Sequence, residues 1–324
     1  MKQNELPTDV SLAECGQRLL EADDIYILSH QYPDGDTLGS AAALCRLLLQ
    51  KGKRVRTLCS DEIPKKFADL YQGLPQEEFS PAFVVAVDVA DVKLLGKKLE
   101  HFGDKIDLCI DHHGSNKRYA RWNYVDPTAA AAAEMIAQLA NLWGVALDPA
   151  VAGAIFTGIT TDTGCFKYTN ATSRTYRIAA DMIDAGADAS RINRIMFDTK
   201  SRARLEIERR VLDTMRFYFD GRCAVVYVTN EMVAQTGAGA DDTDGLASLP
   251  RQVEGVKVGV TLRQREDGAF KASVRTDGVN ASAICAHFGG GGHPAAAGCL
   301  LPGTVEQARE AMLEVVGRAL EEQA

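Results

Sequence analysis

Along the first half of the chain, short runs of Val, Ile and Phe alternate with segments in which apolar positions recur every three or four residues. The strand-like runs cover residues 25–30, 54–60, 83–90, 106–113 and 151–161, and the clearest helical patterns cover 37–50 and 128–143. Strands that alternate with helices favour an α/β fold built on a doubly wound, mostly parallel sheet. We therefore predict this architecture for the N-terminal part.

The pattern changes in the second half. A helical pattern covers 173–185, and a charged helical stretch covers 190–215. Strand-like runs follow at 223–229, 256–265 and 270–276, with helical segments at 243–253, 280–288 and 304–322. The sequence Glu266-Asp267-Gly268 is typical of a hairpin turn between the last two strands. We predict an N-terminal domain over 1–189, a helical connector over 190–215, and a smaller α+β domain over 216–324.

Composition narrows the class of protein. The 324 residues are 46% hydrophobic and 25% charged, which is typical of a globular protein with room for two domains. No apolar run is long enough for a membrane helix, and no apolar stretch follows Lys2 as in a secretory signal. The eight cysteines never occur as Cys-x-x-Cys, which favours reduced core thiols. We expect a cytoplasmic protein without a membrane partner.

The net charge limits the partners. At −8 the chain repels long polyanions, so non-specific binding to long duplex nucleic acid is not expected. The two tryptophans form no regular stacking platform for a long single strand. A nucleic-acid substrate should therefore be small and held by local positive groups. Whether the protein forms a homodimer is left open by the sequence.

Acidic and histidine residues follow four of the predicted strands. They are the residues of His30-x-x-x-Asp34-x-Asp36, then Asp88, then Asp111-His112-His113, and finally Asp162. The carboxyl ends of parallel strands share one edge of a sheet, so these clusters can converge. Taken singly, each has an ordinary interpretation as a turn former, a helix cap or a hydrogen-bonded histidine. Taken together, buried carboxylates that lie close to one another need a cation, and a metal pair is the simplest one.

In these motifs the chain resembles the DHH phosphoesterases. The resemblance rests on the four clusters, on Asn116 three residues after His113, and on Phe288-Gly289-Gly290-Gly291-Gly292-His293-Pro294, which resembles the glycine-rich motif of the DHH-associated C-terminal domain. It extends from about residue 25 to the last helix, with the motifs in the family's order. Length and paired domains are most similar to the branch of oligoribonucleases and phosphoadenosine-phosphate phosphatases.

The resemblance implies a site for two divalent metal ions, most simply Mn²⁺. One ion would be held by His30, Asp34 and Asp88, and the other by Asp36, Asp88, His112 and Asp162, with Asp88 shared. Four aspartates balance the charge of two divalent ions, and seven protein ligands leave several of about twelve coordination positions open for water and phosphate. Asp111 would orient a histidine. His113 would contact the phosphate or protonate the leaving oxygen, or else only position His112.

The resemblance also implies a phosphate site in the C-terminal domain. Backbone N–H groups of Gly290, Gly291 and Gly292 can approach a phosphate closely, and His293 adds a side-chain donor. Arg275 and Asn116 complete the predicted substrate contacts, since a guanidinium matches phosphate geometry. At Lys167, where relatives often carry arginine, the charge is kept but the forked geometry is lost.

The expected enzyme is a two-metal phosphoesterase with its active site in the cleft between the two domains. The expected substrates are short oligoribonucleotides, linear dinucleotides derived from cyclic di-AMP, cyclic di-AMP itself, and 3′-phosphoadenosine 5′-phosphate. The alternatives are an inorganic pyrophosphatase of the related family, a processive single-strand exonuclease, and a nucleotide-sensing module without catalysis. The pyrophosphatase is disfavoured by the glycine-rich motif, and the sensing module by the complete set of metal ligands.

Overall fold

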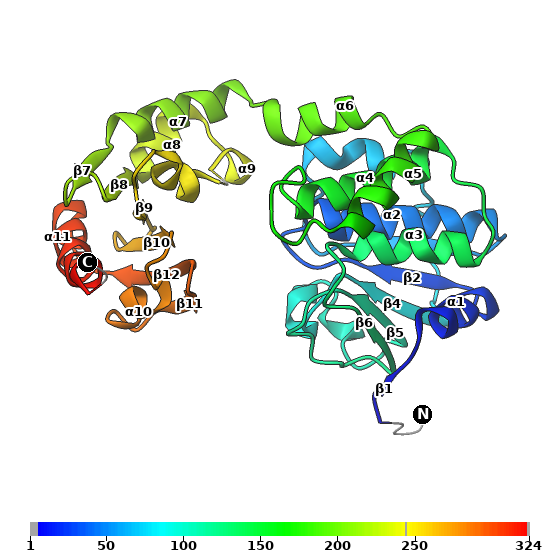
Figure 1. The fold of residues 1–324 in the computed structure, drawn as a ribbon. Coiled ribbons are helices and arrows are strands. Elements are labelled where there is room, and N and C mark those ends of the chain that lie inside the picture. Colours follow the sequence, from blue (N-terminus) through cyan, green and yellow to red (C-terminus); the bar gives the residue numbers. More distant parts are fainter. Residues whose placement is uncertain (1–5, 244, 323–324) are drawn as a thin grey trace. The chain divides into compact units, whose positions relative to one another are not determined.

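The structure is a computed structural model that describes residues 6–243 and 245–322. The chain divides into two compact units, residues 1–199 and 200–324, and each carries its own six-stranded sheet (Figure 1). The division falls within 190–215, the segment expected to connect the domains. Among the described residues, no helix combines the length and the apolar character that a membrane span requires.

The first sheet is entirely parallel, as predicted. Its strands are β1 (Thr8–Asp9), β2 (Ile25–Leu28), β3 (Val55–Leu58), β4 (Phe83–Val87), β5 (Leu108–Asp111) and β6 (Trp122–Val125), in the order β1-β6-β5-β4-β2-β3. The central strands β2 and β4 are buried along their whole length, which explains their continuous apolar sequences. From β2 the chain goes to β3 on one side and then to β4 on the other. The strand order therefore reverses between β2 and β4, where open α/β sheets bind ligands.

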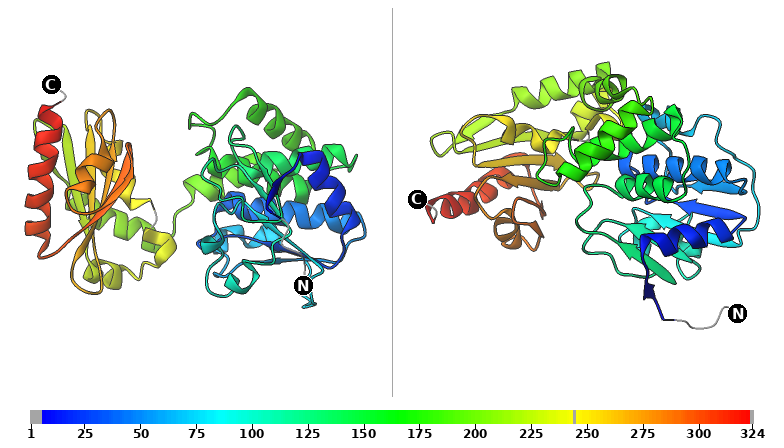
Figure 2. Two further views of the ribbon diagram at one scale, coloured as in Figure 1. Left: turned by 90° about the horizontal axis from the view of Figure 1, so that it is seen from below. Right: turned by 45° about the vertical axis from the view of Figure 1, so that its right-hand side comes forward.

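Helices cover one face of this sheet. Those that pack on the sheet are α1 (Leu12–Glu21), α2 (Gly35–Gln50) and α3 (Ala132–Leu142). Helices α4 (Pro149–Asp162) and α5 (Ser173–Asp184) pack on this layer, mainly on α2 and α3 and on each other. The other face is covered by short 3₁₀ helices, η2 (Val92–Leu95) and η3 (Glu100–Phe102), while η1 (Lys65–Tyr71) packs beside α2 and α4. Figure 2 shows the layer of helices from two further directions. The larger core lies between the sheet and the long helices.

The segment 151–161 is the main correction to the predicted elements, because it forms helix α4 and not a strand. The helix begins with Asp148 as N-cap, whose carboxylate accepts the N–H groups of Ala150 and Val151, and with Pro149 in its first turn. It is buried between its neighbours, so its sequence is apolar on almost every side. A Cβ atom at Gly39 of α2 would lie 2.4 Å from the carbonyl oxygen of Ala154, which shows how closely α2 and α4 approach.

The second unit begins near the helix α7. Its helices are α7 (Arg202–Asp213), α8 (Asn230–Thr236), α9 (Ala240–Thr243), η5 (Leu246–Gln252), α10 (Ala281–Ala286) and α11 (Val305–Glu321). Its strands are β7 (Arg216–Tyr218), β8 (Cys223–Val228), β9 (Val258–Gln264), β10 (Phe270–Thr276), β11 (Gly291–His293) and β12 (Ala296–Leu301). Their order is β11-β12-β10-β9-β8-β7, and the β9–β10 hairpin is present as predicted. Only the β8–β9 pair is parallel among these strands.

The predicted connector is not one helix. It consists of α6 (Ala189–Asn193), the π-helix η4 (Arg194–Asp198), a break, and then α7. Helix α7 packs through Ile207 and Val211 against β8 and so belongs to the second unit. On the opposite face of the second sheet, α10 and α11 pack against the even-numbered residues of β9 and β10. The odd-numbered residues of β10, Lys271, Ser273 and Arg275, consequently lie on the other face.

Candidate metal centre

His30 and Asp34 lie in the turn that joins β2 to α2. Asp34 is the N-cap of α2, and its Oδ1 accepts hydrogen bonds from the N–H groups of Asp36 and Thr37, each at 3.1 Å. The same oxygen lies 3.7 Å from Nε2 of His30. The Nδ1 of His30 lies 2.7 Å from the carbonyl oxygen of Gln31, which turns Nε2 toward the carboxylates. Asp34 therefore caps the helix and also faces the site.

Asp36 lies in the first turn of α2 and is 1% exposed. Its two oxygens accept the backbone N–H groups of Ala132 and Ala133, at 2.6 and 3.0 Å, at the N-terminus of α3. Ser40, one turn later on α2, donates its hydroxyl to the same carboxylate at 3.0 Å. The sequence analysis did not identify Ser40, although its spacing of four residues from Asp36 on a helix is a usable signal. These donors fix the carboxylate and partly neutralise its charge.

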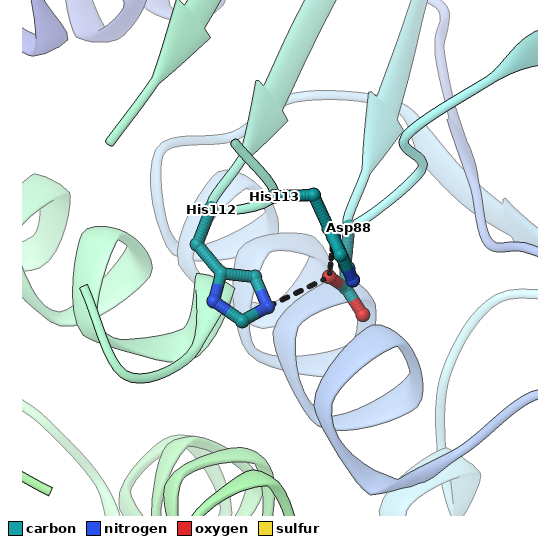
Figure 3. Close-up of side chains that lie close together, drawn as sticks. All are labelled: Asp88, His112 and His113. Carbon is teal, nitrogen blue, oxygen red and sulfur yellow. Dashed lines mark ion pairs between the residues drawn. The ribbon is translucent and has the colours of Figure 1, made fainter. Parts of the chain in front are cut away.

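Asp88 follows β4 directly and is 2% exposed. Its backbone has φ of +60°, the left-handed region that Asp and Asn enter more readily than most residues. This conformation ends the strand. Figure 3 shows the side chain between His112 and His113, and both dashed lines end on one carboxylate oxygen. Oδ1 lies 3.5 Å from Nε2 of His112 and 3.4 Å from Nδ1 of His113. Oδ2 lies 3.7 Å from Nε2 of His30.

The residues after β5 form a tight hydrogen-bonded turn. Oδ1 of Asp111 accepts the N–H groups of His112 and His113 at 2.8 and 3.2 Å, and Nδ1 of His113 at 2.8 Å. Oδ2 accepts the amide of Asn116 at 2.6 Å. Asp111 is fully buried, and both of its oxygens are used within the turn. The carboxylate therefore orients His113 and the two histidine backbones.

Asp162 is the last residue of α4 and not the end of a strand. Its Oδ2 lies 3.6 Å from Nε2 of His112, which also lies 3.7 Å from Oδ2 of Asp36. The close approach of α4 to α2 brings Asp162 to the edge of the sheet. Asp162 was therefore predicted on the wrong type of element.

Three groups of side chains could each hold a metal ion, with their ligand atoms within 4.8 Å of one another. They are His30, Asp34 and Asp88; Asp36, His112 and Asp162; and Asp88, His112 and His113. The first group is the ligand set that the family resemblance implies for one ion, and the second is the set for the other ion without Asp88. Oδ1 of Asp88 is buried and accepts no hydrogen bond from the described residues, which is costly for a carboxylate without a cation. The donor set of imidazoles and carboxylates therefore fits a pair of divalent ions.

The electrostatics of the cluster agree with this fit. Burial alone lowers the pKa of His30, but its contacts with the carboxylates of Asp34 and Asp88 raise that pKa to about 11. The pKa of His112 is raised in the same way, against burial, by Asp88 and Asp36. Burial and then the charge of Asp88 raise the pKa of Asp36, and burial is the main cause that raises the pKa of Asp162 to about 6. Protons thus occupy the cluster where divalent cations would bind.

The predicted phosphate contacts lie in the second unit. Arg275 is half-buried near the end of β10, and within the described part of the chain its Nη1 donates a hydrogen bond to the carbonyl of its neighbour Val274 at 3.2 Å. Gly291 and His293 are exposed in β11. Gly290 and Gly292 have an additional reason to be glycine, since a Cβ atom would lie 2.3 Å from the carbonyl oxygen of Gly298 or 2.6 Å from that of Ala296. Part of the glycine run therefore serves strand packing, and Gly291 leaves an open backbone.

Asn116 needs a correction. It is 6% exposed, and its amide donates to the carbonyl oxygen of Val89 at 3.2 Å as well as to Asp111. Its Oδ1 accepts the N–H of Arg118 at 2.6 Å. Both ends of the side chain are occupied inside the turn, so the predicted substrate contact is replaced by a positioning role.

Both units of the chain match models of known protein families. The model of the DHH family, N-terminal domain, matches residues 24–159, and the model of the DHHA1 domain matches residues 220–322. A bifunctional oligoribonuclease and PAP phosphatase of Thermus thermophilus is 37% identical over 307 residues, which cover 91% of this chain and 90% of that protein. The similarity thus includes both units.

Solved structures share the fold. An exopolyphosphatase-related protein from Bacteroides fragilis superposes with a TM-score of 0.81 at 24% identity, covering 95% of this chain and 96% of that one. The exonuclease RecJ bound to manganese superposes with a TM-score of 0.54 at 15% identity, covering 98% of this chain and 96% of that one. The two-unit α/β architecture is therefore one that has been observed before.

Proposed function

The chain belongs to the DHH family of phosphoesterases, and on that premise we propose that it is a two-metal enzyme that hydrolyses very short nucleic-acid fragments. One observation carries the proposal. Asp88 belongs to two of the three groups that could hold a metal ion, and His112 links it to Asp36 and Asp162 in the third. These groups lie where the order of the parallel strands reverses. A single metal site of structural type would use fewer carboxylates and would leave no open positions.

The residues that would hold one ion are His30, Asp34 and Asp88, and those for the other are Asp36, Asp88, His112 and Asp162. Mn²⁺ is the proposed ion because the ligands mix imidazole with carboxylate, and because the RecJ neighbour is described as bound to manganese. A bound pair of divalent ions would lower the pKa of the attacking water and stabilise charge on the phosphate oxygens.

The chain's own residues prepare the site for in-line attack. Asp36, held by two backbone N–H groups and Ser40, keeps its carboxylate fixed. Asp111 accepts Nδ1–H of His113, so the proton of the neutral ring stays on Nδ1 and Nε2 can meet the substrate. The same contact raises the pKa of His113, with Asp111 as the largest cause, which favours a protonated ring that can contact a phosphate or protonate the leaving oxygen.

The proposed substrates follow the Thermus relative, whose name describes action on oligoribonucleotides and PAP. They are RNA of two to a few nucleotides, linear dinucleotides, cyclic di-AMP and 3′-phosphoadenosine 5′-phosphate. Arg275, the backbone at Gly290, Gly291 and Gly292, and His293 would bind the phosphate that is not cut. The eight cysteines, all with free thiols, support a reducing compartment, and the cytoplasm remains the proposed location.

A product time course tests the proposal. The protein would be incubated with Mn²⁺ and, in parallel, 5′-labelled diadenylate, cyclic di-AMP, 3′-phosphoadenosine 5′-phosphate and pyrophosphate. Release of mononucleotide from the dinucleotide and of phosphate from the bisphosphate is expected. Rapid hydrolysis of pyrophosphate alone would favour the pyrophosphatase alternative. Tight dinucleotide binding without turnover would favour the sensing alternative.

A further inference from the structure

A cavity of about 810 Å³ lies on the second unit, away from the metal ligands in sequence and on the other sheet. It is lined by the end of β8, the β9–β10 hairpin and the residues just before and within η5. Its floor is the face of the sheet that α10 and α11 do not cover. Arg275 lies on this same face of β10, four residues after Lys271.

Two basic side chains in this cavity lie beside each other on adjacent strands. Arg263 of β9 and Lys271 of β10 are direct cross-strand partners, and both are exposed. Like charges in this position are destabilising unless an anion lies between them. Within residues 6–243 and 245–322, neither forms an ion pair with an acidic side chain. Other basic residues of this sheet do form ion pairs: Arg265 pairs with Asp267 at 3.2 Å, and Lys257 pairs with Asp277 at 3.1 Å.

A hydroxyl group adds to these charges. Ser273 also lines the cavity, between Lys271 and Arg275 on the same face of the strand. Lys271 and Arg275 are four residues apart, which corresponds to about 13 Å along the strand. A chain that carries several phosphates can contact both side chains, each through a different phosphate. The row of donors along β10 therefore fits an extended polyanion.

We propose that Arg263, Lys271 and Ser273 form a second phosphate subsite, which binds a further backbone phosphate of an oligonucleotide whose other phosphate lies at Arg275. The subsite rests on the proposed function and specifies its substrate, because it favours oligonucleotides over mononucleotide bisphosphates. An arginine fork beside a lysine is suited to phosphate. Glu266 and Asp267 on the cavity rim limit its net positive charge, which keeps long nucleic acid from binding tightly.

The test measures binding separately from catalysis. The full chain is kept in EDTA so that no hydrolysis occurs, and the affinity for fluorescent pentaadenylate, diadenylate and 3′-phosphoadenosine 5′-phosphate is measured at several salt concentrations. The variant is Arg263→Gln with Lys271→Gln. The control is Arg309→Gln, which removes one positive charge on α11, at the opposite face of the sheet. Circular dichroism and the melting temperature establish that the variants fold.

The double variant is expected to bind the pentamer roughly tenfold more weakly, with the bisphosphate unchanged. The slope of log affinity against log salt should fall by about 0.7 for each lost phosphate contact. Lys271→Arg should retain pentamer binding. Unchanged pentamer binding in the double variant, or an equal loss for all three ligands, would overturn the subsite. Because binding is measured without metal, a wild-type chain that hydrolyses nothing would refute the proposed function and leave this result standing.

Discussion

Nδ1 of His113 donates a hydrogen bond of 2.8 Å to Oδ1 of Asp111. The other oxygen of Asp111 accepts the Asn116 amide, so neither oxygen is free to bind a metal ion. This relationship separates the residues that would hold the ions from those that would orient His113 toward a substrate. The two roles should respond differently to substitution.

Asp111→Asn should lower kcat by about 10- to 100-fold while the metal content stays at the wild-type value. The NH₂ group of an asparagine at this position would face another hydrogen-bond donor, either the amide of Asn116 or Nδ1–H of His113. It also removes the charge that raises the pKa of His113, so the alkaline limb of the kcat profile should move to lower pH. Steady-state kinetics on diadenylate and elemental analysis check both statements. An unchanged pH profile would contradict the role given to Asp111.

Asp88→Asn should abolish binding of the metal pair and lower activity by more than about 100-fold, since both ligand groups use this carboxylate. Asn tolerates the left-handed backbone of Asp88, so the fold should persist. Asp91→Asn, at the half-buried N-cap of η2, is the matched control. Full activity of Asp88→Asn with Mn²⁺ would refute the site.

Metal affinity should rise as the pH rises from 6 to 8. In the metal-free protein His30 has a pKa raised to about 11 and that of His112 is also raised, so both rings are protonated throughout this range. Metal binding must displace these protons, which strengthens the apparent affinity by roughly tenfold per pH unit for each proton released. Calorimetric titration with Mn²⁺ in buffers of different ionisation enthalpy counts the protons. Affinity that is independent of pH would show that the imidazoles are not ligands.

The same shifts predict the stability of the metal-free protein. The folded pKa values of His30 and His112 lie above the ordinary value of 6.5, so their contribution is complete below that pH and is lost as the pH rises toward about 11. Asp162, whose pKa is raised to about 6, acts in the same direction between pH 4 and 6. Urea denaturation in EDTA should therefore show stability that falls as the pH rises from 7 to 9, and excess Mn²⁺ should reverse the trend.

Gly158→Ala should destabilise the protein by about 1–3 kcal/mol. A Cβ atom there would lie 2.6 Å from that of Ala133 and 2.8 Å from Oδ1 of Asp36, so metal affinity should also fall. Gly153→Ala on the same helix is the control. Its Cβ atom would meet only Ile192, at 3.9 Å, and the change should stabilise by about 0.5–1 kcal/mol. Equal effects of the two substitutions in urea denaturation would contradict the packing argument.

The helices and strands that were predicted correctly are those whose own sequence carries the signal for their structure. Strands β2, β4 and β5 are continuous apolar runs, and α2 has both a capping residue and a clear period, so each was identified correctly. The strand predicted at 151–161 was wrong because a helix buried on nearly all sides has no polar face to reveal its period. The length of the run, together with Asp148 and Pro149 at its start, would have indicated α4.

The part of the candidate site that could be predicted is the part in which residue type and position at the end of an element place the side chain. His30, Asp36, Asp88, His112 and Asp162 are brought together as expected. The buried role of Asn116 could not be predicted, since it depends on the carbonyl of Val89, which lies in the segment after β4. Strands β11 and β12 were also missed, because glycine and alanine carry little strand preference. The pairing of β12 with β10, and of β11 with β12, decides their structure.

All the candidate metal ligands lie between residues 30 and 162, within the first unit. During synthesis, this stretch is made before any residue of the second unit, and domains generally fold as they emerge. The nascent chain can thus assemble its ion-binding pocket early. A translation intermediate stalled near residue 230, with the folded first unit outside the exit tunnel, should already retain Mn²⁺.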